Sequence, residues 1–338
     1  MGSFKCRAAK DKVVFVMGAT GTGKSRLAID LALRFGGEIV NSDKMQVYDG
    51  LAVVTNKVTD EECMGVPHHL LGSLPPDADF TAADFREEAT RAVEAIIRRG
   101  RLPIVAGGSN SYIEELVEGS GREFRRRYRC CFLWVDVQQP VLYRFVNERV
   151  DRMVERGLVE EVRALFDPDV VDYSRGIRRA IGVPEMDRYL RAEAAEVDEA
   201  ATTKETLLQA AIDEIKANTC KLTCCQLGKI HRLSNLPGWS AHKVDATEVF
   251  TKSGKEADET WTALVAGPSI DIVAEFLRQE EGEGGDQFGA AAEAEQFAAI
   301  GSMKKGASLV INETVAAVMD IVKAASSKAA PVPVGATV

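Results

Sequence analysis

The sequence predicts an α/β fold in which a P-loop-type parallel sheet is flanked by helices. Short β-branched runs alternate with amphipathic segments through the first 137 residues, and strands that alternate with helices form parallel sheets. A glycine-rich loop at residues 18–25 also separates the first strand from the first helix. In such folds this is the position of a phosphate-binding loop.

Apolar periodicity and glycine stops define the elements of the sheet. Thr81 predicts the start of a helix, because its side chain can cap Asp84 three residues later. Strands are expected at residues 13–17, 38–40, 102–106 and 130–137, and helices at residues 25–35, 81–99 and from near Ser109.

Beyond residue 138 the pattern becomes mostly helical, which predicts a smaller helical region that covers the substrates. Helices are expected at residues 141–156, 158–166 and 204–233, and late strands at residues 243–246 and 261–265. The predicted organisation is an N-terminal extension (1–12), a core with helical insertions (13–280), and a low-complexity linker with a loose tail (281–338). Within that tail, residues 308–325 are expected to form a helix.

Composition excludes several classes of protein. The 338 residues carry a formal charge of −9, and 46% are hydrophobic, which is ordinary for a globular chain. No apolar run is long enough for a membrane span, and the acidic balance argues against a broad nucleic-acid surface. Seven scattered cysteines suit a reducing compartment rather than a disulfide framework. The first residues hold no apolar targeting segment, so we expect any such peptide to be absent or already removed.

The strongest motif is GATGTGKS, which satisfies the pattern G-x-x-x-x-G-K-[ST]. Its glycines let successive N–H groups point at a phosphate, and the following helix adds its positive dipole end. Lys24 is expected to neutralise phosphate oxygens, and Ser25 or Thr20 to hold Mg²⁺. The predicted phosphate-binding residues are Gly18, Ala19, Thr20, Gly21, Thr22, Gly23, Lys24 and Ser25.

A generic nucleotide hydrolase is one interpretation of this loop. Such an enzyme needs a second aspartate at the end of a neighbouring strand to hold magnesium. Only Asp136, within FLWVDV, ends a hydrophobic strand, and no switch segment or arginine finger is visible. The sequence therefore favours a different use of the phosphate loop.

Six further blocks follow the loop in a fixed order. They are NSDKMQVYDGL (41–51), GVPHHLLG (65–72), DFTAADFR (79–86), PIVAGGSNSYIEEL (103–116), VNERVDRMVERGLVEEVRAL (146–165) and YSRGIRRAIGVPE (173–185). Together they resemble the isopentenyltransferases, and above all the plant adenylate isopentenyltransferases that start cytokinin biosynthesis. The resemblance covers roughly residues 13–275.

This resemblance implies that a dimethylallyl group moves from dimethylallyl diphosphate to the exocyclic amine of adenine in ATP or ADP, and less readily in AMP. It implies that the phosphate loop holds the diphosphate of the prenyl donor, with Thr20 near the diphosphate and Mg²⁺. The family's matching aspartate makes Asp43 the general base. From its position after a strand alone, Asp43 is equally well a turn residue.

Other residues of these blocks are expected near the substrates. Ser42 belongs to the block of Asp43, and Ser109 and Asn110 follow two glycines at a helix start, where they can bind substrates or cap the helix. Arg178 and Arg179 are candidates for contact with the acceptor phosphates.

One position departs from the family pattern. Many isopentenyltransferases carry an arginine in the long helix that holds the donor's diphosphate, whereas this chain has Cys225. Lys221 and Lys229 lie four residues before and after it, on one helical face. We expect one or both lysines to supply the missing charge; a solvated lysine pair is the alternative.

Three further features receive structural interpretations. Adjacent histidines point in different directions, so His68 and His69 are interpreted as structural or pocket residues rather than metal ligands. Cys220, Cys224 and Cys225 are interpreted as core residues. The five arginines between residues 122 and 129 are interpreted as a solvated face.

A tRNA isopentenyltransferase is the second alternative. Those enzymes typically carry G-G-T-G-L-Y where this chain has GGSNSY, residues 107–112, and a tRNA binder is expected to present a basic surface. The prediction is therefore a small nucleotide acceptor, with no tRNA or membrane partner and with a monomeric state. The resemblance implies a plastid location, with the cytoplasm as the alternative.

Overall fold

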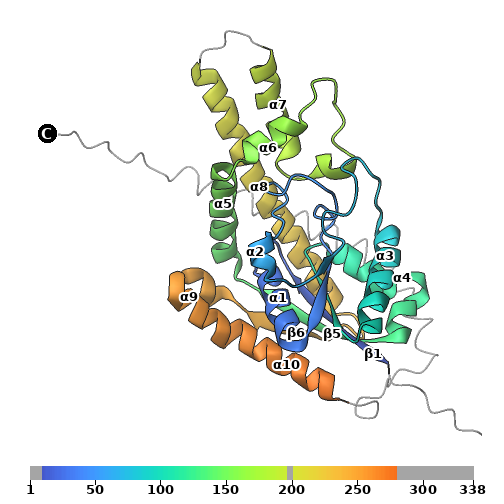
Figure 1. Cartoon of the computed structure of the whole chain (residues 1–338). Coiled ribbons are helices and arrows are strands. Elements are labelled where there is room, and N and C mark those ends of the chain that lie inside the picture. Colours follow the sequence, from blue (N-terminus) through green and yellow to red (C-terminus); the bar gives the residue numbers. More distant parts are fainter. Residues whose placement is uncertain (1–9, 196–200, 280–338) are drawn as a thin grey trace, which may run out of the picture. The chain divides into compact units, whose positions relative to one another are not determined.

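A six-stranded sheet organises the part of the chain that this computed structural model describes, residues 10–195 and 201–279 (Figure 1). The strand order is β3-β2-β4-β1-β5-β6, and every neighbouring pair is parallel. The strands are β1 (Asp11–Gly18), β2 (Gly37–Asn41), β3 (His68–His69), β4 (Leu102–Ala106), β5 (Tyr128–Asp136) and β6 (Ala241–Asp245). Residues 13–17 of β1 are fully buried, as expected for a central strand covered on both faces.

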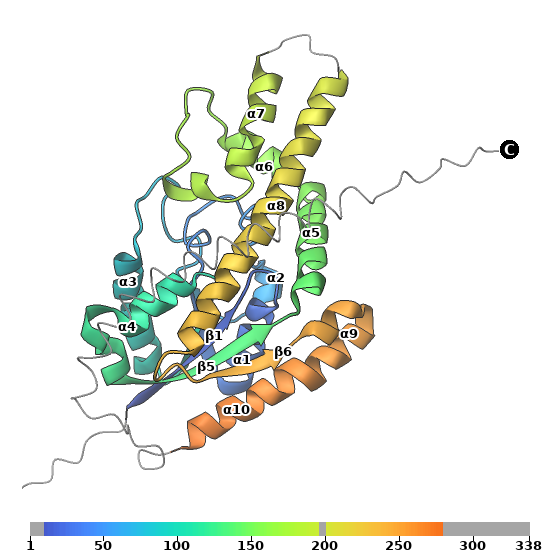
Figure 2. The same ribbon diagram turned by 180° about the vertical axis from the view of Figure 1, so that it is seen from behind.

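Helices cover both faces of this sheet (Figures 1 and 2). Helices α1 (Lys24–Phe35) and α10 (Gly267–Arg278) pack on one face, and α3 (Ala82–Arg98), α4 (Asn110–Arg127) and the end of α8 (Ala201–Ser234) pack on the other. The connection from β1 to β2 runs in the opposite direction across the sheet to the connections from β3 to β4 and from β4 to β5. Right-handed crossovers therefore place α1 on the opposite face to α3 and α4.

A second hydrophobic cluster lies beside the sheet and is built mainly of helices. Helices α5 (Gln139–Glu155), α6 (Leu158–Leu165), α7 (Val183–Ala194) and the first half of α8 contribute to it, together with the segment after β2. Helix α8 belongs to both clusters: Ile215 is buried in the helical one and Ile230 in the core around the sheet. This long helix thus joins the helical region to the sheet.

The remaining elements are short. They are α2 (Asp60–Cys63), α9 (Gly254–Trp261), 3₁₀ segments at Gly176–Arg179 and Thr247–Thr251, and a π-helical turn at Thr262–Ala266. Within the described residues, no helix combines the length and the apolar character that crossing a membrane requires.

The predicted fold class is confirmed, and most predicted elements have their expected type. Thr81 caps α3 as predicted, since its side chain accepts from the N–H of Asp84. The strand predicted at 261–265 is wrong: Trp261 ends α9, and the next residues form a π-helical turn in which the N–H of Gly267 bonds to the carbonyl of Thr262. A short apolar run fits a strand and a buried helix equally well. The predicted tail and its helix at 308–325 lie outside the described residues.

Several structural interpretations also hold. His68 Nδ1 lies 2.8 Å from the carbonyl oxygen of Val66, and His69 Nε2 lies 2.7 Å from Glu38 Oε2. Cys220 and Cys224 are buried in the core, and Cys225 is half-buried. Three of the five arginines between residues 122 and 129 pair with glutamates: Arg122 and Arg125 with Glu118, and Arg127 with Glu94. Arg126 and Arg129 donate to the main-chain carbonyls of Gly121 and Gln279.

Glu38 ties the edge of the sheet to the end of α3. This buried carboxylate accepts from Arg99 at 2.6 Å and 3.1 Å, and it also bonds to His69 of β3. The hydrogen bond from Arg99 is the main reason why the pKa of Glu38 lies below its ordinary value of 4.5. The charged form therefore stabilises the fold above about pH 4.5, and this contribution is lost as the pH falls through the lower folded pKa.

We expect Glu38→Gln to lower the free energy of unfolding by about 2 kcal/mol at neutral pH, because it replaces the charge-assisted hydrogen bonds from Arg99 at a buried position with weaker neutral ones. The deficit relative to the unsubstituted protein should shrink as the pH falls below about 4.5. Urea unfolding across this pH range measures both effects. Glu88→Gln removes an exposed ion pair with Arg91 and should change stability by less than about 0.5 kcal/mol. A deficit for Glu38→Gln that is independent of pH would contradict this assignment.

Candidate active site

Three loops meet at the carboxyl edge of the sheet, because β2, β4 and β1 are neighbours. The loop after β2 is bonded to β4, since the N–H of Ser42 donates to Ala106 at 2.8 Å. It is also bonded to the loop after β4: the N–H of Ser109 donates to Ser42 at 3.2 Å, and Ser109 Oγ accepts from the N–H of Lys44 at 2.9 Å. The predicted residues Ser42, Asp43 and Ser109 therefore lie together.

The phosphate loop after β1 requires its glycines. Gly21 and Gly23 have φ angles of 83° and 91°, in the left-handed region that favours glycine. A Cβ at Gly21 would lie 2.8 Å from Val146 of α5, and a Cβ at Gly23 would lie 2.7 Å from the ring of Trp261. The loop is thus held between α5 and the end of α9, and α1 begins directly after it at Lys24.

Lys24 is buried at the base of this loop. It is 9% exposed, and its Nζ donates to the carbonyl of Ala19 at 2.6 Å. Burial lowers the pKa of Lys24 to about 8; the neighbouring Asp43 carboxylate raises it and Arg149 lowers it further. Because the buried ammonium group of Lys24 has lost its water, an anion bound beside it would stabilise its charged form.

Arg149 of α5 supplies a second cation to the loop. Its Nη2 donates to Thr20 Oγ1 at 3.0 Å. Burial lowers the pKa of Arg149 to about 10, whereas Asp43 raises it. Its Nε is buried and has no hydrogen-bond partner within the described residues. A buried cationic donor without a partner is costly, and an anion bound at the loop would satisfy it.

Arg149 was not among the predicted site residues. It lies 129 residues from Thr20 in the chain, so no local pattern joins the two. The available signal was its position within VNERVDRMVERGLVEEVRAL, the block that resembles the isopentenyltransferases. At the loop it provides a guanidinium from α5, whereas the sequence suggested that the charge missing at Cys225 comes from lysines of α8.

Trp261 is another residue of the site that the sequence analysis did not find. Its ring packs against Gly23, its Nε1 donates to Asp30 at 2.8 Å, and the guanidinium of Arg26 lies 4.7 Å from the ring centroid. The indole thus fixes the start of α1 against α9. Trp261 ends α9 and the π-helical turn follows it, so the segment predicted to be a strand is helical.

Asp43 uses its two oxygens differently. Oδ1 accepts from the N–H of Met45 at 3.0 Å, which is the turn role that the sequence left open. Oδ2 lies toward the glycines after β4, since a Cβ at Gly108 would be 3.4 Å from it. The turn contact therefore leaves the second oxygen available for a substrate.

Three basic residues collect near Asp43. Burial, followed by the charges of Arg179 and Lys229, lowers the pKa of Lys44, and Asp43 raises it. Arg179 is held by its own contacts, since it donates to Tyr48 at 3.0 Å and to the carbonyl of Gly176 at 3.2 Å. We call Lys44, Arg179 and Lys229 the basic cluster.

The structure does not bring every predicted residue to this site. Arg178 donates to the carbonyl of Leu165 at 3.1 Å, in the helical region rather than at the loops. On an ideal helix Lys221 is about 140° away from Gln226, which touches the phosphate loop, whereas Lys229 is about 60° away. Among the described residues, no contact joins Lys221 to the phosphate loop.

The surroundings of the loop fit a magnesium ion that is held mainly by phosphates. No group of three His, Cys, Asp or Glu residues in the described ranges could hold a metal. Ser25 is exposed at the start of α1, whereas the hydroxyl of Thr20 already accepts from a cation. Ser25 is therefore the better candidate ligand. Asp136, the aspartate that a hydrolase would need, pairs with Lys243 at 2.8 Å.

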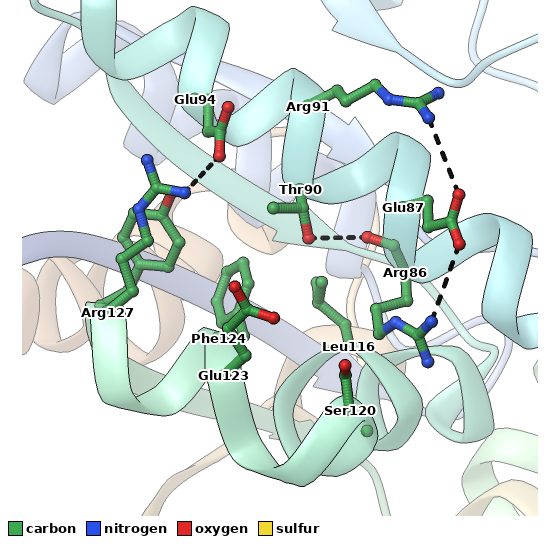
Figure 3. A pocket seen from close by; sticks show the side chains of 12 residues that line it. Arg86, Glu87, Thr90, Arg91, Glu94, Leu116, Ser120, Glu123, Phe124 and Arg127 are labelled. Atoms are coloured by element: carbon green, nitrogen blue, oxygen red, sulfur yellow. Dashed lines mark hydrogen bonds and ion pairs between the residues drawn. The ribbon is translucent and has the colours of Figure 1, made fainter.

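A separate cavity of about 340 Å³ lies between α3 and α4 (Figure 3). It forms where α4 kinks, with Ser120 and Arg122 in the left-handed region. The arginines on its rim are paired with glutamates: Arg86 with Glu115, Arg91 with Glu88, and Arg127 with Glu94. With its cations neutralised, this cavity is a poorer anion site than the phosphate loop.

The fold and the site define a class: proteins with a P-loop suited to a diphosphate or triphosphate group beside a carboxylate, here that of Asp43. A family model described as IPP transferase matches residues 46–127 and 120–228. Adenylate isopentenyltransferase 5, chloroplastic, of Arabidopsis thaliana is 64% identical over 269 residues, which is 79% of this chain and 81% of the relative. Adenylate isopentenyltransferase 3, chloroplastic, of the same plant is 57% identical over 79% of this chain and 80% of the relative. The chain belongs to the isopentenyltransferase (IPP transferase) family.

Solved structures agree with this assignment. A tRNA isopentenylpyrophosphate transferase from Bacillus halodurans has a TM-score of 0.61 at 26% identity, covering 80% of this chain and 100% of that chain. A eukaryotic dimethylallyltransferase described as acting on tRNA has a TM-score of 0.64 at 23% identity, covering 81% of each chain, and supports the fold alone.

We expect the affinity for inorganic diphosphate to depend on the charge of Lys24. With a pKa of about 8, this lysine is cationic below that pH and neutral above it. The ratio of affinities between the unsubstituted protein and Lys24→Met should therefore fall as the pH rises from about 7 to about 9. Calorimetric titration measures the ratio, which cancels the ionisation of diphosphate itself. Lys255→Met, at an exposed lysine of α9, should give a ratio near one throughout. A constant ratio for Lys24→Met would contradict the assignment.

Proposed function

We propose that this protein transfers a dimethylallyl group from dimethylallyl diphosphate to the exocyclic amine of adenine in ATP or ADP, the first step of cytokinin biosynthesis. The observation that carries the proposal is the pairing of Lys24 and Arg149 at a phosphate loop with Asp43 close to both. The diphosphate leaving group needs cations to stabilise its negative charge, and the amine needs a carboxylate to accept its proton. The identity of 64% to a protein named adenylate isopentenyltransferase supports the same reaction.

The phosphate loop is the donor side of the proposed reaction. As the allylic C–O bond breaks, the diphosphate leaves with the electron pair, and Lys24, Arg149 and the loop N–H groups stabilise its developing charge. Mg²⁺ would neutralise further phosphate charge, and the hydroxyl groups of Ser25 and Thr20 would hold it. Neither role requires water to attack a phosphate. The proposed reaction therefore does not need Asp136, the aspartate that a hydrolase would use and that here pairs with Lys243.

Asp43 acts on the acceptor. The adenine amine is a weak nucleophile, because its lone pair is delocalised into the ring. As the new N–C bond forms, Asp43 Oδ2 accepts a proton from the amine nitrogen. Oδ1 stays bonded to the N–H of Met45, so the carboxylate is oriented before the substrate binds.

The basic cluster is the proposed site of the acceptor phosphates. Lys44, Arg179 and Lys229 come from three separate parts of the chain, yet their charges interact beside Asp43. Such crowding of cations is unfavourable without a bound anion. ADP and ATP place more negative charge there than AMP does, which accounts for a preference for the longer nucleotides.

The names of the relatives support a proposal for the cellular location of this protein. The similar proteins are named chloroplastic, and a third, adenylate isopentenyltransferase 7 of Arabidopsis thaliana at 57% identity, is named mitochondrial. We assign this protein to an organelle, and propose the plastid. We further propose that it works as a monomer and does not modify tRNA.

One assay separates the candidate functions. The protein is incubated with dimethylallyl diphosphate, Mg²⁺ and one of AMP, ADP, ATP or tRNA, and the products are identified by mass spectrometry. The proposal requires prenylated ADP and ATP. Prenylated tRNA alone would indicate a tRNA enzyme, and release of inorganic phosphate from ATP without the prenyl donor would indicate a hydrolase.

We expect Asp43→Asn to lower kcat by about 10²-fold or more, with the KM values of both substrates changed less than about threefold. An asparagine keeps the oxygen that accepts from the N–H of Met45, so the turn survives while the base is lost. Steady-state kinetics with ADP measures the effect. Asp49→Asn alters a turn aspartate of the same segment and should leave kcat unchanged. Near-normal turnover of Asp43→Asn would mean that Asp43 is a turn residue only.

We expect Lys44→Ala and Lys229→Ala each to raise the KM for ADP and ATP about tenfold, which corresponds to roughly 1.4 kcal/mol. The KM for AMP should rise less, and the KM for dimethylallyl diphosphate should not change. Initial rates with the three nucleotides measure the pattern. Lys255→Ala serves as the control at an exposed lysine. Equal effects on all three nucleotides would contradict a role in binding the terminal phosphates.

A further inference from the structure

Gln226 of α8 contacts two of the three loops of the site. Its side chain is 7% exposed. Oε1 accepts from the N–H of Thr20 in the phosphate loop at 2.7 Å, and Nε2 donates to the carbonyl of Gly108 after β4 at 2.9 Å. One amide therefore bridges the loops that follow β1 and β4.

The bridge uses both ends of the amide, so its chemistry is specific. An acceptor must face the N–H of Thr20 and a donor must face the carbonyl of Gly108, and a carboxamide of this length offers both. A second amide reinforces the arrangement: Asn110 Nδ2 donates to the carbonyl of Gly108 at 3.3 Å and to the main-chain carbonyl of Gln226 at 3.5 Å. The start of α4 and the middle of α8 are thereby joined at this point.

The bridged loop is in contact with Asp43. A Cβ at Gly108 would lie 2.6 Å from Gln226 Nε2 and 3.4 Å from Asp43 Oδ2, and a Cβ at Gly107 would lie 2.7 Å from the N–H nitrogen of Asp43. The two glycines thus pack directly between the bridge and Asp43. A shift of this loop relative to the phosphate loop would move the carboxylate relative to the bound diphosphate.

We propose that Gln226 is a positioning residue that fixes the distance between the phosphate loop and Asp43. The proposal rests on the proposed function, in which the diphosphate leaves at one loop while the proton goes to the other. The reacting nitrogen must then lie in line with the breaking C–O bond, and a misplacement of about 1 Å can cost about 10²-fold in rate. Gln226 touches neither reacting atom; it acts through the two loops.

The first test is Gln226→Met, which keeps the length of the side chain and removes both hydrogen bonds. We expect kcat, measured in single turnovers with saturating dimethylallyl diphosphate and ADP, to fall about 30-fold or more, while both KM values change less than about threefold. The matched control is Gln209→Met, at an exposed position of the same helix, which should leave kcat unchanged.

The second test is Gln226→Asn. This variant keeps the neutral amide but lacks one methylene, so it cannot reach both the N–H of Thr20 and the carbonyl of Gly108. We expect its single-turnover rate with saturating substrates to fall about 10-fold or more, while both KM values change less than about threefold.

The outcomes are distinguishable. If the unsubstituted protein does not prenylate ADP or ATP, the proposed function fails. If it does, the positioning role is overturned by a Gln226→Met variant with unchanged kcat, or by one in which only a KM changes. If Gln226→Met does not fold, Gln226→Asn decides: a lower kcat with nearly unchanged KM values supports the role, and an unchanged kcat overturns it.

Discussion

The placement of two desolvated cations beside one carboxylate is the electrostatic constraint on which this site depends. Burial lowers the pKa values of Lys24 and Arg149, while Asp43 raises both. The carboxylate thus helps to keep the cations charged before an anion arrives. In the proposed reaction, a bound diphosphate would take over this role at the loop and leave Asp43 free to act on the acceptor.

The fold meets this constraint with parts that are distant in sequence. Strands β1, β2 and β4 bring the three loops together, α5 contributes Arg149, and Trp261 holds the start of α1. Helix α8 spans the core of the sheet and the helical region. A residue such as Gln226 on this helix can therefore couple the loops to the region in which Arg179 of the basic cluster is anchored.

Local patterns predicted the sheet and the phosphate loop, because each depends on a few consecutive residues. The role of Asp43 as base came from the resemblance and stays a prediction. Arg149 and Gln226 reach Thr20 from 129 and 206 residues away, and only the tertiary fold brings them there. Arg178 and Arg179 are adjacent in sequence, yet one bonds to Leu165 and the other to Tyr48. The motif identified the pair, but the side-chain directions that separate their roles depend on the surrounding packing. The strand prediction for residues 261–265 failed for a related reason. A short apolar run fits a strand or a helix, and only its packing in the fold determines which one forms.

The chain has a net charge of −9 but a cationic site, because its cations are paired with carboxylates in some places and not in others. On α3 and α4, arginines are matched by glutamates: Arg127 faces Glu94, and Arg122 and Arg125 share Glu118. Such pairs cancel charge on the outer surface and leave little to attract a phosphate. At the loops, Lys24 donates to a main-chain carbonyl and Arg149 to a hydroxyl, and within the described residues no ion pair cancels their charge. Low-dielectric walls focus the electric field of such charges. We therefore expect the cations at the loops to attract an anionic substrate, although the net charge of the chain is negative.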